Sequence, residues 1–139
     1  MKKIIALSVA LMMVATFSFG QHKAMEKWTE LKTFHEVMSQ TFHPAEKGDL
    51  KPIRARAGEM LEKAQALAKS NRPADFNNEK VNTAMDQLVQ RVTSLKGLVD
   101  KNAADAIVLK ILTGAHQSFH EIMGEREESH EWHEHHDGH

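Results

Sequence analysis

The stretch NAADAIVLKILTGAHQSFHEIMG, residues 102–124, decides how the chain folds. Its apolar residues recur at steps of three and four, which places them on one face of an α-helix. Asn102 is suited to cap the start of this helix, and the apolar pattern stops after Gly124. The predicted buried face consists of Val108, Ile111, Leu112, Ala115, Phe119, Ile122 and Met123.

Three earlier stretches repeat this apolar pattern. The first extends from about His22 to Phe42, the second follows Asp49, and the third lies between breaks at residues 70–75 and 100–102. Asp49 is suited to cap the second helix. No stretch alternates apolar and polar residues as a half-buried strand does. The three predicted buried faces consist of Met25, Trp28, Leu31, His35, Met38 and Phe42; of Ile53, Ala57, Met60, Leu61, Ala64, Leu67 and Ala68; and of Val81, Met85, Leu88, Val92, Leu95 and Val99.

Four helices of about twenty residues joined by short breaks favour one architecture, because short connections force neighbouring helices to run antiparallel. We therefore expect an all-α protein in which residues 21–124 form an up-down-up-down antiparallel four-helix bundle. Residues 125–139 lack the apolar pattern and are rich in charge and histidine, so we expect a disordered tail there.

Residues 1–20 have the pattern of a secretory signal peptide. A basic start and an apolar run from Ile4 to Val14 precede the small residues Ser18 and Gly20 at the expected cleavage site. The apolar run is shorter than the ~20 residues that a membrane span needs. We therefore expect cleavage, a periplasmic mature chain and no stable membrane anchor.

The composition excludes several classes of function. Lys and Arg number 18 against 19 Asp and Glu, a balance unlike that of a nucleic-acid-binding protein. The absence of cysteine excludes a thiol nucleophile, a thiolate zinc site, an iron–sulfur cluster and thioether-linked haem. The sequence has no nucleophile elbow, phosphate-binding loop or zinc-protease motif, and we predict no enzymatic activity.

Half of the ten histidines lie in the last ten residues, interleaved with carboxylates. Imidazole and carboxylate groups are good ligands for zinc and copper, so this segment predicts binding of transition-metal ions with modest affinity. A solubilising tail with incidental affinity is the alternative. The five candidate ligands are His130, His133, His135, His136 and His139.

Four further histidines lie within the predicted bundle. His116 and His120 are four residues apart on one helix face, the spacing at which two imidazoles bind one metal ion. His35 and His116 fall on predicted buried faces, where an imidazole needs partners for its ring nitrogens. A zinc or copper site built from His35, His43, His116 and His120 explains these positions. Hydrogen bonds to neighbouring groups are the alternative.

The register between the first and last helices determines which residues converge, because residues level with each other in two antiparallel helices have numbers with a constant sum. If the first helix continues through Glu46 and the last begins near Asp105, the sum is about 151 and His35 lies level with His116. His120 then lies one turn away, and Met38, His43 or Glu46 is placed to complete the site.

A second register follows if the first helix ends near Thr41 and the last begins near Ala104. The sum is then about 145, and Met25 faces His120. The two registers differ by a slide of ~9 Å, and the sequence leaves both open.

The segment from Thr41 to Glu46 also has two interpretations. Pro44 disfavours a helical conformation at the residue before it, which is His43. In the first interpretation an extended His43 closes a metal site over His35. In the second, an ordinary helix end leaves His43 in solvent.

The string GAHQSFHE, Gly114 to Glu121, resembles the corresponding stretch of the periplasmic four-helix cytochromes. In cytochrome c prime this stretch carries Cys-x-x-Cys-His, and its histidine is the axial haem ligand. Here His116 and Phe119 stand where the cysteines would be, and only His120 matches. The b-type relatives hold haem through an early methionine and a late histidine that follows an aromatic residue. Met25 and the pair Phe119-His120 are similar to that arrangement.

Three functions therefore remain open. The first is a periplasmic zinc- or copper-binding protein for metal buffering, delivery or resistance, with a periplasmic efflux or metal-handling protein as a possible partner. The second, implied by the resemblance, is an electron carrier that holds haem b through Met25 and His120. The third is a structural bundle that engages a protein partner in an efflux or stress system.

Overall fold

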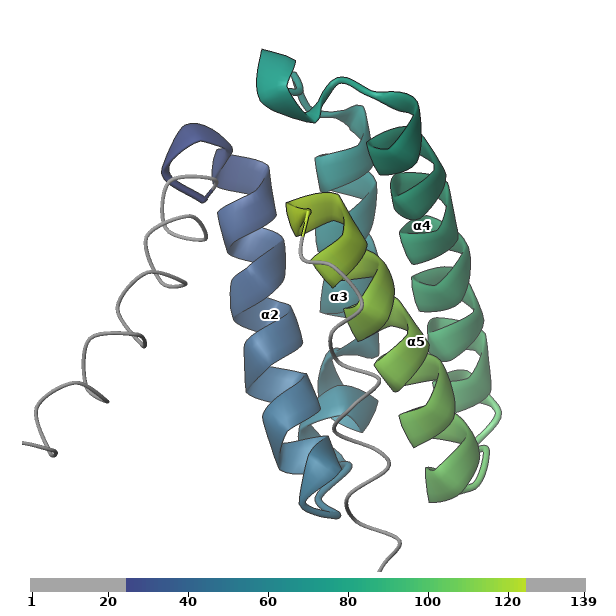
Figure 1. The fold of residues 1–139 in the computed structure, drawn as a ribbon. Helices are drawn as coiled ribbons and strands as arrows, with labels where there is room; N and C mark the ends of the chain where they lie inside the picture. Colours follow the sequence, from purple (N-terminus) through teal and green to yellow (C-terminus); the bar gives the residue numbers. More distant parts are fainter. Residues whose placement is uncertain (1–24, 125–139) are drawn as a thin grey trace, which may run out of the picture.

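The computed structural model describes residues 25–124 and confirms an all-α chain: these residues form four α-helices and no strand. The predicted signal peptide, residues 1–20, and the predicted tail, residues 125–139 with its five histidines, lie outside the described residues. None of the described helices has the length and hydropathy required to cross a bilayer. The elements are α2 (Thr29–Glu46), α3 (Lys51–Lys69), the short 3-10 helix η1 (Ala74–Phe76), α4 (Glu79–Asp100) and α5 (Asp105–Met123) (Figure 1).

The four helices lie side by side and share one hydrophobic core (Figure 1). Each helix packs against the next along the chain, most closely α4 against α5, whereas α2 and α5 contact each other less than any two consecutive helices do. The C-terminal end of α5 lies at the same end of the molecule as the start of α2 (Figure 1). The largest fully buried side chains are Trp28, Phe34, Leu31, Met38, Ile53, Met60, Leu67, Leu88, Leu95, Leu112, Ile122 and Val92.

Helix α2 continues four residues beyond its predicted end at Phe42. Pro44 lies inside its last turn, so the expectation of an extended His43 is wrong: this residue is helical. Burial explains why the helix persists, because Phe42 and Ala45 both enter the core from this last turn. The backbone carbonyls of Pro44 and Ala45 accept hydrogen bonds from residues 47–49, which satisfies the end of the helix.

Neither predicted cap is the N-cap residue of its helix. The Asp49 carboxylate accepts a hydrogen bond from the Lys51 backbone N–H at 3.1 Å, but the N-cap residue of α3 is Leu50, and no side chain caps this helix. Asn102 does not cap α5, which begins at Asp105. Instead, Asn102 has φ +53° in the preceding turn, a left-handed conformation that asparagine tolerates better than most residues.

The buried faces of α2 and α5 are rotated slightly from the predicted ones. Phe34 and Ala115 are fully buried, while their neighbours His35 and His116 are only half-buried. The core-facing side of a helix is at least ~100° wide. A pattern of three- and four-residue steps therefore does not decide which of two adjacent residues at the edge of this side is buried. Both histidines therefore lie at the edge of the core, where polar and apolar surroundings meet.

A guanidinium group joins α4 to α5. One terminal nitrogen of Arg91 on α4 donates hydrogen bonds to the backbone carbonyl of Gly114, at 2.8 Å, and to the buried hydroxyl of Ser118. A Cβ at position 114 would lie 3.4 Å from the Arg91 side chain, so glycine gives the guanidinium room to approach the helix backbone. These contacts hold the half of α5 that carries His116 and His120.

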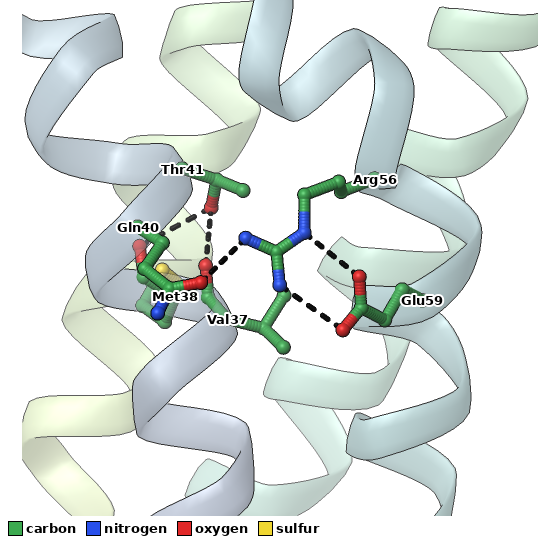
Figure 2. Close-up of polar contacts among 6 residues, drawn as sticks. All are labelled: Val37, Met38, Gln40, Thr41, Arg56 and Glu59. Carbon is green, nitrogen blue, oxygen red and sulfur yellow. Dashed lines mark hydrogen bonds and ion pairs between the residues drawn. The ribbon is translucent and has the colours of Figure 1, made fainter.

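A second guanidinium group joins α2 to α3 (Figure 2). Arg56 on α3 donates to both carboxylate oxygens of Glu59, at 2.8 and 3.0 Å, and to the side-chain carbonyl of Gln40 on α2 at 2.6 Å. The hydrogen bond from Arg56 lowers the pKa of Glu59. Close by, the buried Thr41 hydroxyl donates to the carbonyl of Val37 within its own helix (Figure 2).

Two substitutions in α5 test this description of the core. Leu112 is fully buried, whereas Ile107 is 50% exposed. We expect Leu112→Ala to lower the free energy of unfolding by about 2–5 kcal/mol because it leaves a cavity. The matched control, Ile107→Ala, should change it by no more than about 0.5 kcal/mol. Urea denaturation followed by circular dichroism measures both; equal losses would contradict the assigned face of α5.

Candidate metal centre

Two histidines from α2 and two from α5 lie along the side where these helices meet. The ring of His35 stacks on Phe119 of α5, with centroids 5.4 Å apart and an interplanar angle of 24°. The ring of His116 stacks on Phe42 of α2 at 3.9 Å and 14°. The rings of His35 and His116 thus each lie against a phenylalanine from the opposite helix, which restricts their orientation through a stacked contact.

The closest pair of imidazoles is His116 and His120. Their Nε2 atoms are 3.0 Å apart, their ring centroids are 4.3 Å apart, and the rings are inclined at 74°. In the metal-free protein one Nε2–H can donate a hydrogen bond to the other Nε2, which requires different tautomers for the two rings. The predicted spacing of four residues therefore brings the two Nε2 atoms together beside the helix.

The distance between these nitrogens matches that of two ligands on one ion. With bonds of about 2.0–2.1 Å, two nitrogens lie ~2.9 Å apart at a right angle and ~3.4 Å apart at the tetrahedral angle. The observed 3.0 Å falls between these values. The same 3.0 Å is also the length of a hydrogen bond between the two rings, so the distance is compatible with a metal-ligand pair without being specific for one.

The surroundings of His116 disfavour its protonated form. Burial is the largest cause, and the neighbouring imidazoles of His120, His43 and His35 add smaller electrostatic effects; together they lower the pKa of His116 to about 4. This imidazole is therefore neutral at neutral pH. A neutral imidazole keeps the nitrogen lone pair that a metal ion needs, so protons compete weakly for this position.

The other two predicted bundle ligands do not join the pair in the described part of the chain. His43 is exposed in the last turn of α2, and its Nδ1 lies 3.4 Å from the Glu46 carboxylate. His35 is half-buried and stacked on Phe119. Within residues 25–124, no three histidine or carboxylate side chains converge closely enough to hold a metal ion. The four-histidine site is therefore not formed within these residues, and His116 and His120 remain as the candidate pair.

The observed register between α2 and α5 lies near the first of the two predicted ones. Helix α2 continues through Glu46 and α5 begins at Asp105, as that register requires. The rings of Phe34 and Phe119 are 5.6 Å apart, and His35 faces Phe119 rather than His116. The pairing therefore differs from the predicted one by about one helical turn, because the buried aromatic contacts set the level of the helices.

The conditions for the second register are not met, since α2 does not end near Thr41. Met25 lies before α2, and the extended residue Trp28 separates it from the start of that helix at Thr29. It lies at a shallow surface depression with Glu26, Thr29 and Lys32. The register does not bring Met25 opposite His120.

Sequence reasoning missed the stacking partner of His116. Phe42 was expected only as a member of the buried face of the first helix, yet its ring also stacks on His116. The position of Phe42 in the sequence does not indicate this stacking, because the contact depends on the register between α2 and α5.

Comparison of the chain with protein-family models, with curated proteins and with solved structures gives no match.

The pKa of His116 predicts a pH dependence of stability. Between about pH 6.5, the value for an unperturbed histidine, and the folded value of about 4, the unfolded chain binds a proton that the folded chain does not. The stability linked to neutral His116 is thus fully present above about pH 6.5 and is lost as the pH falls toward 4. We expect the free energy of unfolding of the His116→Gln variant to fall less over this pH range, as measured by urea denaturation at each pH. An equally steep decline in the variant would show that another group causes it.

Proposed function

We propose that this protein binds a transition-metal ion, zinc or copper, through His116 and His120, and that it serves in metal buffering, delivery or resistance in the periplasm. The observation that carries the proposal is the 3.0 Å separation of the two Nε2 atoms. The same proposal includes export of the chain, with cleavage after residue 20. It also includes a partner, a periplasmic efflux or metal-handling protein that receives or supplies the ion.

The position of the pair on one helix supports chelation. Both imidazoles project from α5 one turn apart, so binding of the first nitrogen places the second within reach of the same ion. Arg91 holds this part of α5 through Gly114 and Ser118, and Phe42 holds the ring of His116. Little conformational freedom is lost when the ion binds, which favours affinity.

We propose further that the helices form an up-down-up-down antiparallel four-helix bundle. The connections at residues 47–50 and 101–104 are short, and short connections favour antiparallel neighbours. The contact of Phe34 with Phe119 brings the first and last of the four together. In this architecture the metal ion lies on the seam between α2 and α5, near the end of the bundle where α5 terminates.

Zinc and copper suit the donor set better than harder ions do. Imidazole nitrogen is a favoured ligand of both, whereas magnesium and calcium prefer oxygen ligands. The chain has no cysteine that would select a softer thiolate site. Two imidazoles do not distinguish zinc from copper, since 3.0 Å is compatible with the preferred angles of either.

A variant that conserves composition tests the proposal. His120→Gln combined with Gln117→His keeps all ten histidines but places the second imidazole next to His116 in sequence, where adjacent residues do not face each other. We expect its tightest zinc or copper binding, measured by calorimetry, to weaken at least about tenfold because the chelate is lost.

Gln117 is exposed, so the exchange should preserve the fold, and circular dichroism checks this. Equal affinities in the original and rearranged proteins would overturn the proposal, since metal binding would then not depend on the spacing of the pair.

A further inference from the structure

We propose that His43 of α2 is a third ligand of the ion at His116 and His120, oriented by Glu46, so that the bound ion bridges α2 and α5. This inference rests on the proposed function and adds a ligand to the same site. It also gives the ion a second role, because α2 and α5 contact each other less than any two consecutive helices do.

Two imidazoles leave the coordination of the ion incomplete. Protein sites for zinc commonly supply three or four ligands. The pair supplies two nitrogens, and within residues 25–124 no third histidine or carboxylate converges with them in the metal-free arrangement. A third ligand from this part of the chain is therefore a side chain that lies near the pair and moves toward it when the ion binds.

His43 follows the residue that contacts the pair from the opposite helix. The Phe42 ring stacks on the His116 ring with centroids 3.9 Å apart, and its centroid lies 6.0 Å from that of the His43 ring. The stacking sets Phe42 level with His116, and the next residue along the helix is only ~1.5 Å further. His43 therefore lies nearly level with His116.

The electrostatics of His116 indicate the same proximity. Burial is the largest cause of its lowered pKa, and the neighbouring imidazoles follow in the order His120, His43, His35. Because the repulsion between like charges weakens with distance, this order places His43 nearer to His116 than His35. The His35 ring is also half-buried and stacked on Phe119, which restricts its rotation.

His43 can change its side-chain conformation without disturbing the core. Its side chain is 65% exposed, and its backbone is held in the last turn of α2. Rotation about the Cα–Cβ bond between staggered rotamers moves the ring and leaves the backbone and the buried side chains in place. Binding of the ion therefore requires the movement of one exposed side chain toward the pair.

Glu46 prepares His43 for metal binding. Nδ1 of His43 lies 3.4 Å from a carboxylate oxygen of Glu46. When Nδ1–H donates to this carboxylate, the neutral ring keeps its lone pair on Nε2, the same atom that the pair presents. Metal-bound histidines commonly donate their second nitrogen to a carboxylate, which makes the ligand more basic. The Glu46 side chain is half exposed, so it can follow the ring.

Ligands from both helices link metal binding to the packing of α2 against α5. Separation of these helices would destroy the site, so the ion stabilises their contact by mass action. Three histidines also leave one position of a tetrahedral zinc ion open. A ligand from the protein that receives the ion can enter at this position, which suits a role in delivery.

Three single variants of the full chain test the inference. His43→Gln removes the proposed ligand, and Glu46→Gln removes the charge of the orienting carboxylate. His35→Gln is the matched control, since it removes another imidazole from the same helix. Zinc affinity is measured by competition with a chromophoric chelator, and circular dichroism checks the fold. Nuclear magnetic resonance of the ¹⁵N-labelled imidazoles shows which nitrogens bind the tightest ion.

We expect the affinity for the tightest zinc ion to fall roughly 100-fold in His43→Gln, because a chelating ligand is lost. It should fall about tenfold in Glu46→Gln, as is typical for a carboxylate that orients a ligand. The control should change little. In the original protein the Nε2 signal of His43 should shift in step with those of His116 and His120, which a merely structural role of His43 would not produce.

Three outcomes would overturn the inference. An unchanged zinc affinity in His43→Gln, or a His43 signal that stays constant while those of the pair shift, would do so and leave the proposed function standing. A loss in His35→Gln at least as large as that in His43→Gln would assign the third ligand to His35. If zinc shifts the signals of neither His116 nor His120, the proposed function fails together with this inference.

Discussion

The contact between Phe34 of α2 and Phe119 of α5 sets the level of the two helices that carry the candidate site. Both rings are buried, and their centroids lie 5.6 Å apart. If α2 slid by one turn along α5, these two rings would no longer face each other in the close-packed core. The loss of stability would be several kcal/mol, since removing one buried phenylalanine ring alone costs about 3–5 kcal/mol. At this level Phe42 lies against His116, so the core determines the position of the imidazole pair.

The position of His116 at the edge of the core determines how readily this imidazole binds a proton. His116 lies at the edge of the core, buried enough for its pKa to fall to about 4 yet close to His120 on the accessible side of the helix. The two Nε2 atoms that share a hydrogen bond are the atoms that would bind the proposed ion. Metal binding there would replace a net stabilisation of about 0.5–1.5 kcal/mol with two metal–nitrogen bonds, against weak proton competition at His116.

Local patterns predicted the four helices and the spacing of the pair, because both depend on the period of one helix. Properties that depend on contacts between helices were predicted less well. Pro44 suggested an end to α2 that the burial of Ala45 overrides, and His35 was expected in the core where Phe34 lies. The register, the stacking of Phe42 on His116, and the facing Nε2 atoms required side-chain packing that the sequence alone does not specify.

The central claim is that His116 and His120 bind one ion through their Nε2 atoms. Nuclear magnetic resonance of the ¹⁵N-labelled imidazoles during zinc titration tests it directly, because coordination changes the chemical shift of the bound nitrogen and fixes the tautomer of its ring. We predict that the Nε2 signals of His116 and His120 shift together, in proportion to one ion per chain. Zinc-dependent shifts confined to other histidines, with these two unchanged, would contradict the account.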